Sequence, residues 1–150
     1  MRILLLNSIL YTPRTLSKGR FIPKVTSIED CMIIKLGIEF AEQGHDVTLV
    51  AAEEYKPTVH QDFPIKIIYF RSIWPQLFQP ALLPFHPQLI RFIRKHKKQF
   101  DMVISSEVFS FNSLFAACLV PRKTLIWQES GKHNRKFFRL PSLIWYNLIA

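Results

Sequence analysis

The chain has 150 residues, of which 49% are apolar and 13% aromatic, enough for one domain with a substantial core. This composition argues against global disorder, and no run reaches the roughly 18 uninterrupted apolar residues that a membrane-spanning helix needs. The net charge is +9, and residues 91–150 carry 11 of the 20 Lys and Arg but only 3 of the 11 Asp and Glu. Such a basic region attracts anionic partners, whether a membrane surface, a nucleic acid or a phosphorylated substrate.

The first predicted element is a strand over residues 2–7 (RILLLN), a nearly continuous apolar run typical of a strand buried on both faces of a parallel sheet. Residues 8–25 lack periodicity and exceed an ordinary strand-to-helix loop, so we expect a functional loop there. Within it, Lys18, Gly19 and Arg20 place two cations beside a flexible glycine, which suits the phosphate oxygens of a donor or of an anionic acceptor. A solvated basic loop is the alternative interpretation.

A helix is predicted next, with two overlapping capping boxes at its start: Thr26 with Glu29, and Ser27 with Asp30. Gly44 ends this helix in the left-handed conformation that glycine adopts readily. A second strand follows at residues 46–51 (DVTLVA), and a right-handed crossover makes the two strands parallel neighbours.

The second half of the chain continues the alternation of strands and helices. Strands are predicted at 65–70, 101–105 and 123–127, and helices from Pro87, at 109–119 and at 143–150. The helix from Pro87 should turn its apolar residues inward and its basic residues outward.

This order predicts an α/β fold: a Rossmann-like, doubly wound parallel sheet in a three-layer α/β/α arrangement. Ligands of such sheets bind beyond the carboxyl ends of the strands, where the strand order reverses. The candidate segments are therefore 8–25, 106–111 and 128–134. Neither the two cysteines nor the five histidines show the spacing of a metal site, so we expect no metal and no cofactor.

Four phrases of the chain resemble the N-terminal, acceptor-side domain of family-4-like glycosyltransferases of the two-Rossmann-domain (GT-B) type: MRILLLNS, EFAEQGHDVTLVAAEEY, DMVISSE and KTLIWQESGKH. The resemblance spans essentially the whole chain. It implies a nucleotide-sugar donor and a polysaccharide or glycolipid acceptor, in the cytoplasm or peripherally at the inner membrane face. The family's second Rossmann domain, which holds most donor contacts, would follow Ala150, so we expect this chain alone to be inactive.

Site residues are expected after the fourth and fifth predicted strands. Glu129 could act as a general base toward an acceptor hydroxyl or orient it, and its alternative role is a loop acid paired with Lys132. Many members of the family carry a His after the fifth strand, where this chain has Gln128 and Glu129, followed by His133. We place Glu107, Gln128 and His133 at the acceptor, although Glu107 could instead compensate charge at a helix N-terminus.

A second function class stays open, a basic Rossmann-like module that binds nucleic acid or another anionic partner without catalysis. Only the net charge favours it, since the chain lacks RNA-binding and helix-turn-helix motifs, and nucleic acid is not an expected partner. A nicotinamide-dependent oxidoreductase is excluded because no G-x-G-x-x-G follows the first strand.

Overall fold

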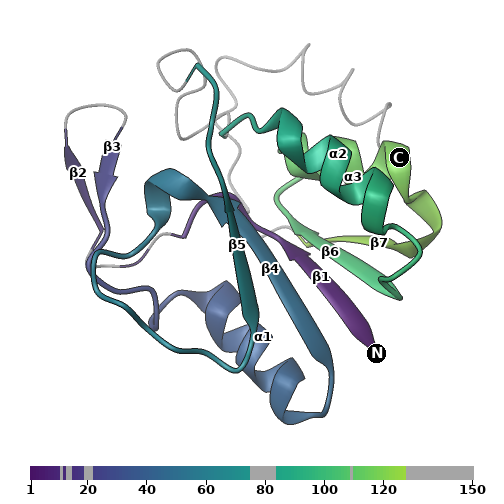
Figure 1. The fold of residues 1–150 in the computed structure, drawn as a ribbon, viewed down its shortest axis with the longest axis horizontal. Coiled ribbons are helices and arrows are strands. Elements are labelled where there is room, and N and C mark those ends of the chain that lie inside the picture. The colour runs from purple at the N-terminus through teal and green to yellow at the C-terminus, as the bar shows by residue number, and fades with distance from the viewer. Residues whose placement is uncertain (11, 13–14, 19–21, 75–83, 109, 128–150) are drawn as a thin grey trace.

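The computed structural model describes residues 1–10, 12, 15–18, 22–74, 84–108 and 110–127 (Figure 1). Its main sheet has five strands, all parallel, in the order β5-β4-β1-β6-β7. Their bounds are Arg2–Leu6 (β1), Asp46–Ala52 (β4), Lys66–Phe70 (β5), Met102–Ser106 (β6) and Thr124–Trp127 (β7). All five predicted strands are therefore confirmed, as is the parallel pairing of the first two.

Three helices cover the two faces of this sheet: α1 (Met32–Glu42), α2 (Pro87–His96) and α3 (Phe111–Leu119). Successive side chains of a strand point to opposite faces, so β1 sends Leu5 into one core with α1, and Leu4 and Leu6 into a second core with α2 and α3. Figure 1 shows α1 on one side of the sheet and α2 and α3 on the other. The predicted Rossmann-like α/β arrangement is confirmed.

The helix α1 ends as predicted but begins later than predicted. Gly44 has a φ of +83°, the left-handed conformation that stops the helix. Both capping boxes were wrong: the residue at the cap is Cys31, and no side chain bonds there. The reason is a long-range contact, since Gln61 Oε1 accepts a hydrogen bond from the backbone of Ile28 at 2.8 Å and holds that segment outside the helix.

The segment after β1 was predicted as a long functional loop, without strands of its own. It contains a two-stranded antiparallel hairpin, β2 (Leu16–Lys18) with β3 (Ile22–Lys24), in which Lys18 pairs with Ile22. Strands of three residues are too short to produce a recognisable alternation of apolar and polar residues.

The connection from β4 to β5 contains a short 3-10 turn, η1 (Glu53–Tyr55), and an extended loop where a doubly wound fold ordinarily has a helix. A second 3-10 turn, η2 (Pro121–Lys123), leads into β7. In the described part of the chain, no helix has the length and apolar character needed to span a membrane.

Candidate functional site

The order of the sheet reverses between β1 and β6. The chain runs outward from β1 to β4 and β5, and then returns to add β6 and β7 on the other side of β1. Two crossovers leave in opposite directions at this point, and open α/β sheets in general bind their ligands beyond the strand ends at such a point. Asn7 and Ser8 follow β1, and Glu107 follows β6, so polar residues stand at this edge.

Three buried polar side chains meet there, from three distant parts of the chain. Ser8 Oγ lies 2.8 Å from Nε2 of His86, the residue that precedes α2, and it accepts a hydrogen bond from Nδ2 of Asn112 in α3, also at 2.8 Å. Ser8 is 3% exposed, His86 0% and Asn112 1%. We call these three residues the switch-point cluster.

The hydrogen bonds of the switch-point cluster are compatible with a single assignment of its protons. Asn112 donates to Ser8, and with the Ser8 hydroxyl assigned as the donor to Nε2 of His86, the ring proton sits on Nδ1. Two buried atoms are left without a hydrogen-bond partner among the described residues, Nδ1 of His86 and Oδ1 of Asn112. Each such group destabilises the fold by about 1–3 kcal/mol if nothing pairs with it.

Burial also sets the charge of the cluster. It lowers the pKa of His86 to about 4, because the imidazolium would lose its hydration in this environment. His86 is therefore neutral near pH 7, and the unpaired donor and acceptor both belong to neutral groups.

Next to the cluster, a set of serine residues fixes the start of α3 against β6. Ser110 is the helix cap, and its Oγ accepts a hydrogen bond from the backbone of Ser113 at 2.9 Å. Ser113 Oγ in turn lies 2.9 Å from Ser105 Oγ and 2.7 Å from the carbonyl oxygen of Glu107. This network holds Asn112, one residue away, in its position.

Glu107 has a strained backbone at the carboxyl end of β6. Its φ is +66°, which raises the energy of a non-glycine residue by about 1–2 kcal/mol. The bond from Ser113 and a second one, from the Glu107 amide to the carbonyl oxygen of Trp127 at 2.8 Å, hold this conformation. Strain of this kind concentrates at functional sites.

The arrangement is suited to binding and positioning a polar ligand. A serine hydroxyl bonded to an imidazole is also the core of a nucleophilic site, but such a site needs a group that orients the other ring nitrogen. In the described ranges, no residue pairs with Nδ1 of His86. Hydrogen bonding to a ligand is therefore the chemistry that this geometry favours.

The predicted site residues have different outcomes. Glu107 lies at the switch-point edge, half-buried, three residues before the helix cap Ser110, and both of its predicted roles stay predictions. Lys18 belongs to the β2–β3 hairpin. Gly19, Arg20, Gln128, Glu129 and His133 lie outside the described residues, and their roles stay predictions.

Sequence reasoning pointed to the edge of the sheet at which the switch-point cluster lies, but it did not name the three residues of that cluster. Ser8 and Asn112 carry a weak signal, since both lie close to predicted strand ends. His86 carries none, because it follows a segment without periodicity and meets Ser8 only through the tertiary fold.

Within the part of the chain that the structure describes, no three His, Cys, Asp or Glu residues gather in a way that could hold a metal ion. Comparison with protein-family models and with curated proteins gives no match.

Proposed function

We propose that this chain is the acceptor-side, N-terminal domain of a glycosyltransferase that moves a sugar from a nucleotide-sugar donor to a polysaccharide or glycolipid acceptor. The observation that carries the proposal is the switch-point cluster, which lies where Rossmann-like domains bind ligands. The four sequence phrases that resemble family-4-like glycosyltransferases support the same function.

The chemistry of the cluster suits a hydroxyl-bearing acceptor. A hydroxyl group donates and accepts hydrogen bonds at once, so sugar hydroxyls can pair with donors and acceptors alike at this edge of the sheet. His86 is neutral near pH 7, so the cluster offers an ionised phosphate or carboxylate no opposite charge. This side of the site therefore suits a neutral, hydroxyl-rich ligand.

In this proposal the donor is held mainly by a second Rossmann domain, and transfer takes place between the two domains, where positioning supplies much of the rate. Glu107 contacts the acceptor, and Glu129 orients or deprotonates its reacting hydroxyl. The 150-residue chain is then an acceptor-binding domain without turnover of its own.

Glycan binding followed by amide NMR tests this function. We expect neutral oligosaccharides to shift the amide signals of Ser8, Glu107 and Asn112, and Asn112→Ala to weaken that binding about tenfold, the loss of one or two hydrogen bonds. Ser27→Ala, on the α1 side of the sheet, is the matched control. Glycans that leave all three signals unchanged, together with no sugar transfer by the chain extended with a donor domain, would refute the proposal.

A second candidate function, the binding of nucleic acid or another anionic partner without catalysis, has one observation in its favour. The exposed side of α2 and the turn after it carries five cations and no acid: Arg91, Arg94, Lys95, Lys97 and Lys98. A surface of one sign suits an anionic partner without any catalysis.

A further inference from the structure

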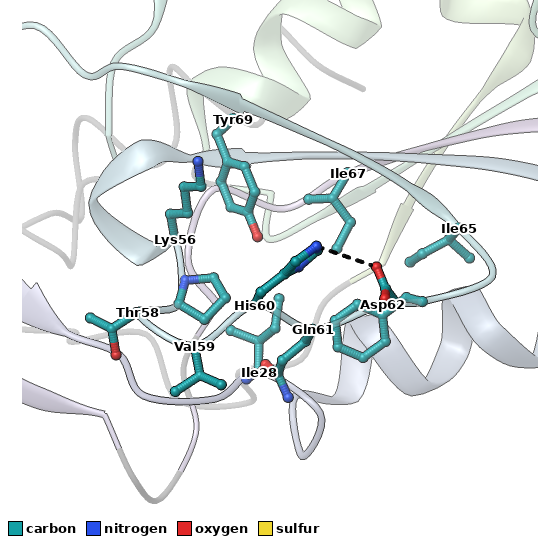
Figure 2. Close-up of a pocket in the computed structure, with 12 residues that line it drawn as sticks. Ile28, Lys56, Thr58, Val59, His60, Gln61, Asp62, Ile65, Ile67 and Tyr69 are labelled. Carbon is teal, nitrogen blue, oxygen red and sulfur yellow. Dashed lines mark hydrogen bonds and ion pairs between the residues drawn. The ribbon is translucent and has the colours of Figure 1, made fainter.

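A hollow of about 540 Å³ lies beside the edge strand β5 (Figure 2). The connection from β4 to β5 has no helix to cover this place. Helix α1 packs against Ile65, just before β5, since a Cβ atom on Gly37 would lie 2.9 Å from Cδ1 of Ile65. The loop over residues 56–63 covers the rest and leaves a space in front of Ile67 and Tyr69.

Hydrogen bonds fix the loop that walls this hollow. The amide of Thr58 donates to the carbonyl oxygen of Val25 at 3.0 Å. Gln61 reaches the segment before α1 twice, because its Oε1 accepts from the amide of Ile28 at 2.8 Å and its Nε2 donates to Ser27 Oγ at 2.9 Å. The loop is therefore held at two points, Thr58 and Gln61.

The hollow has an apolar floor and a polar end. Ile28, Ile65 and Ile67 line the floor, and the phenol of Tyr69 points into the space between Lys56 and His60 (Figure 2). Lys56 Nζ lies 5.9 Å from the centre of the Tyr69 ring. Burial raises the pKa of Tyr69 to about 12, so its hydroxyl keeps its proton and can donate.

The charges at the polar end favour an anion. Lys56 supplies an ammonium group, and Tyr69 offers a neutral donor. His60 Nε2 lies 3.6 Å from Asp62 Oδ1, and the two side chains are 87% and 95% exposed. Asp62 also lines the hollow, and solvent screens its carboxylate at this exposure.

We propose that this hollow binds a small amphipathic anion, whose carboxylate or phosphate lies among Lys56, His60 and Tyr69 and whose apolar body lies on Ile28, Ile65 and Ile67. The volume lies within the range of small-molecule sites, and so does the combination of an apolar floor with a few polar groups. Strand β4 separates the hollow from Ser8, so this site is distinct from the switch-point cluster and does not rest on the proposed transferase function.

Amide NMR titration of the chain with four probes tests the site: phenyl phosphate, phenylacetate, the neutral 2-phenylethanol and inorganic phosphate. We expect at least one aromatic anion to give saturable shifts around the loop 56–63 and β5, with Kd below about 1 mM. The tighter of the two aromatic anions identifies the preferred anionic group. The neutral 2-phenylethanol and inorganic phosphate should each bind at least about tenfold more weakly than the aromatic anion. 2-Phenylethanol lacks the anionic group, and inorganic phosphate lacks the apolar body.

Variants locate the binding. Lys56→Met should weaken the aromatic anion about tenfold while leaving the neutral probe unchanged, and Tyr69→Phe should weaken the anion about threefold or more. Lys66→Met is the matched control. Lys66 is an exposed cation on β5, the strand that carries Tyr69, and its side chain does not line the hollow. Absence of saturation, equal binding of the neutral probe, or an equal effect of Lys66→Met would overturn the proposal.

Discussion

Ser8 Oγ lies 2.8 Å from Nε2 of His86, although 78 positions separate the two residues in the chain. Ser8 follows the central strand of the sheet, and His86 immediately precedes α2. One hydrogen bond therefore joins the middle of the sheet to a helix on its surface, and Asn112 adds the start of α3 to the same point. The predictions begin with this contact.

The stability of the fold should depend on pH through His86. Its pKa is about 4 in the folded chain and near 6.5 when unfolded, so between these values the unfolded chain binds a proton that the folded chain does not. The free energy of unfolding should therefore fall as the pH decreases from about 6.5 to about 4, by up to about 3 kcal/mol. Urea denaturation at several pH values measures this loss. The His86→Gln variant should no longer show this pH-dependent loss of unfolding free energy. The His60→Gln variant, changed at an exposed position, should still show it.

Ser8 and Asn112 should be energetically coupled. Ser8→Ala leaves buried polar atoms of both neighbours unpaired, so we expect a loss of about 1–3 kcal/mol in unfolding free energy. In a double-mutant cycle with Asn112→Ala, the two effects should deviate from additivity by about 0.5–3 kcal/mol. Ser27→Ala combined with Asn112→Ala is the control pair and should be additive. Additive effects for Ser8 and Asn112 would contradict the hydrogen bond between them.

Replacement of Glu107 by glycine should separate stability from acceptor binding. Glycine adopts a φ of +66° without strain, so Glu107→Gly should leave the melting temperature unchanged or raise it slightly, despite the greater freedom of the unfolded chain. If Glu107 contacts the acceptor, the same variant should bind glycans several-fold more weakly. Calorimetry and NMR titration measure the two effects. A variant that loses both stability and binding would show that the Glu107 side chain has a structural role.

Glu129→Gln should reduce catalysis in the chain extended by a donor domain. A base or an acceptor-orienting group acts mainly on the transition state, so kcat should fall while the KM for the nucleotide-sugar changes little. Steady-state assays with varied donor concentration provide both constants. An unchanged kcat would assign Glu129 to a solvated loop, and turnover by the 150-residue chain alone would contradict the requirement for a second domain.

The basic side of α2 should bind anionic membranes. Each basic residue near an anionic surface contributes about 1 kcal/mol before salt screening, and the described part of α2 and the turn after it presents five exposed cations. Cosedimentation with anionic vesicles should exceed that with neutral vesicles and should decrease at high salt.

Substitutions test which cations take part. Binding should weaken when Arg94 and Lys95 of α2 are changed to Ser together with Arg135 and Lys136, which belong to a second basic stretch of the sequence (132–139) outside the described residues. Lys24→Ser with Lys66→Ser should have little effect. Equal recovery with neutral and anionic vesicles would exclude this mechanism, and tighter binding to nucleic acid than to vesicles would favour the second candidate function.

The order of strands and helices could be predicted because it depends on local patterns. The run around Leu4, Leu5 and Leu6 is apolar on both faces because helices cover both sides of β1, and Gly44 marks a helix end by its conformational freedom alone. The start of α1 could not be predicted, since Gln61, which holds Ile28 outside the helix, lies 33 positions away.

In the candidate site, too, a residue whose place depends on the neighbouring sequence could be predicted, whereas a contact between distant residues could not. Glu107 was identified because it directly follows a buried strand in an α/β pattern. The contact between Ser8 and His86 depends on the reversal of strand order and on the path of the chain between β5 and α2. No spacing within the sequence encodes that contact, so the most buried part of the site became visible only in the fold.

The central place of β1 also has a consequence during protein synthesis. β1 leaves the ribosome before its partner strands: Ile3 pairs with Val47 on one side and with Met102, roughly a hundred residues on, at the other. At about 5–20 residues per second, the second edge of β1 waits on the order of 5–20 s for its partner. The nascent chain therefore carries an uncovered apolar strand for that time, during which a chaperone that recognises extended apolar segments can hold Leu4–Leu6 until β6 emerges.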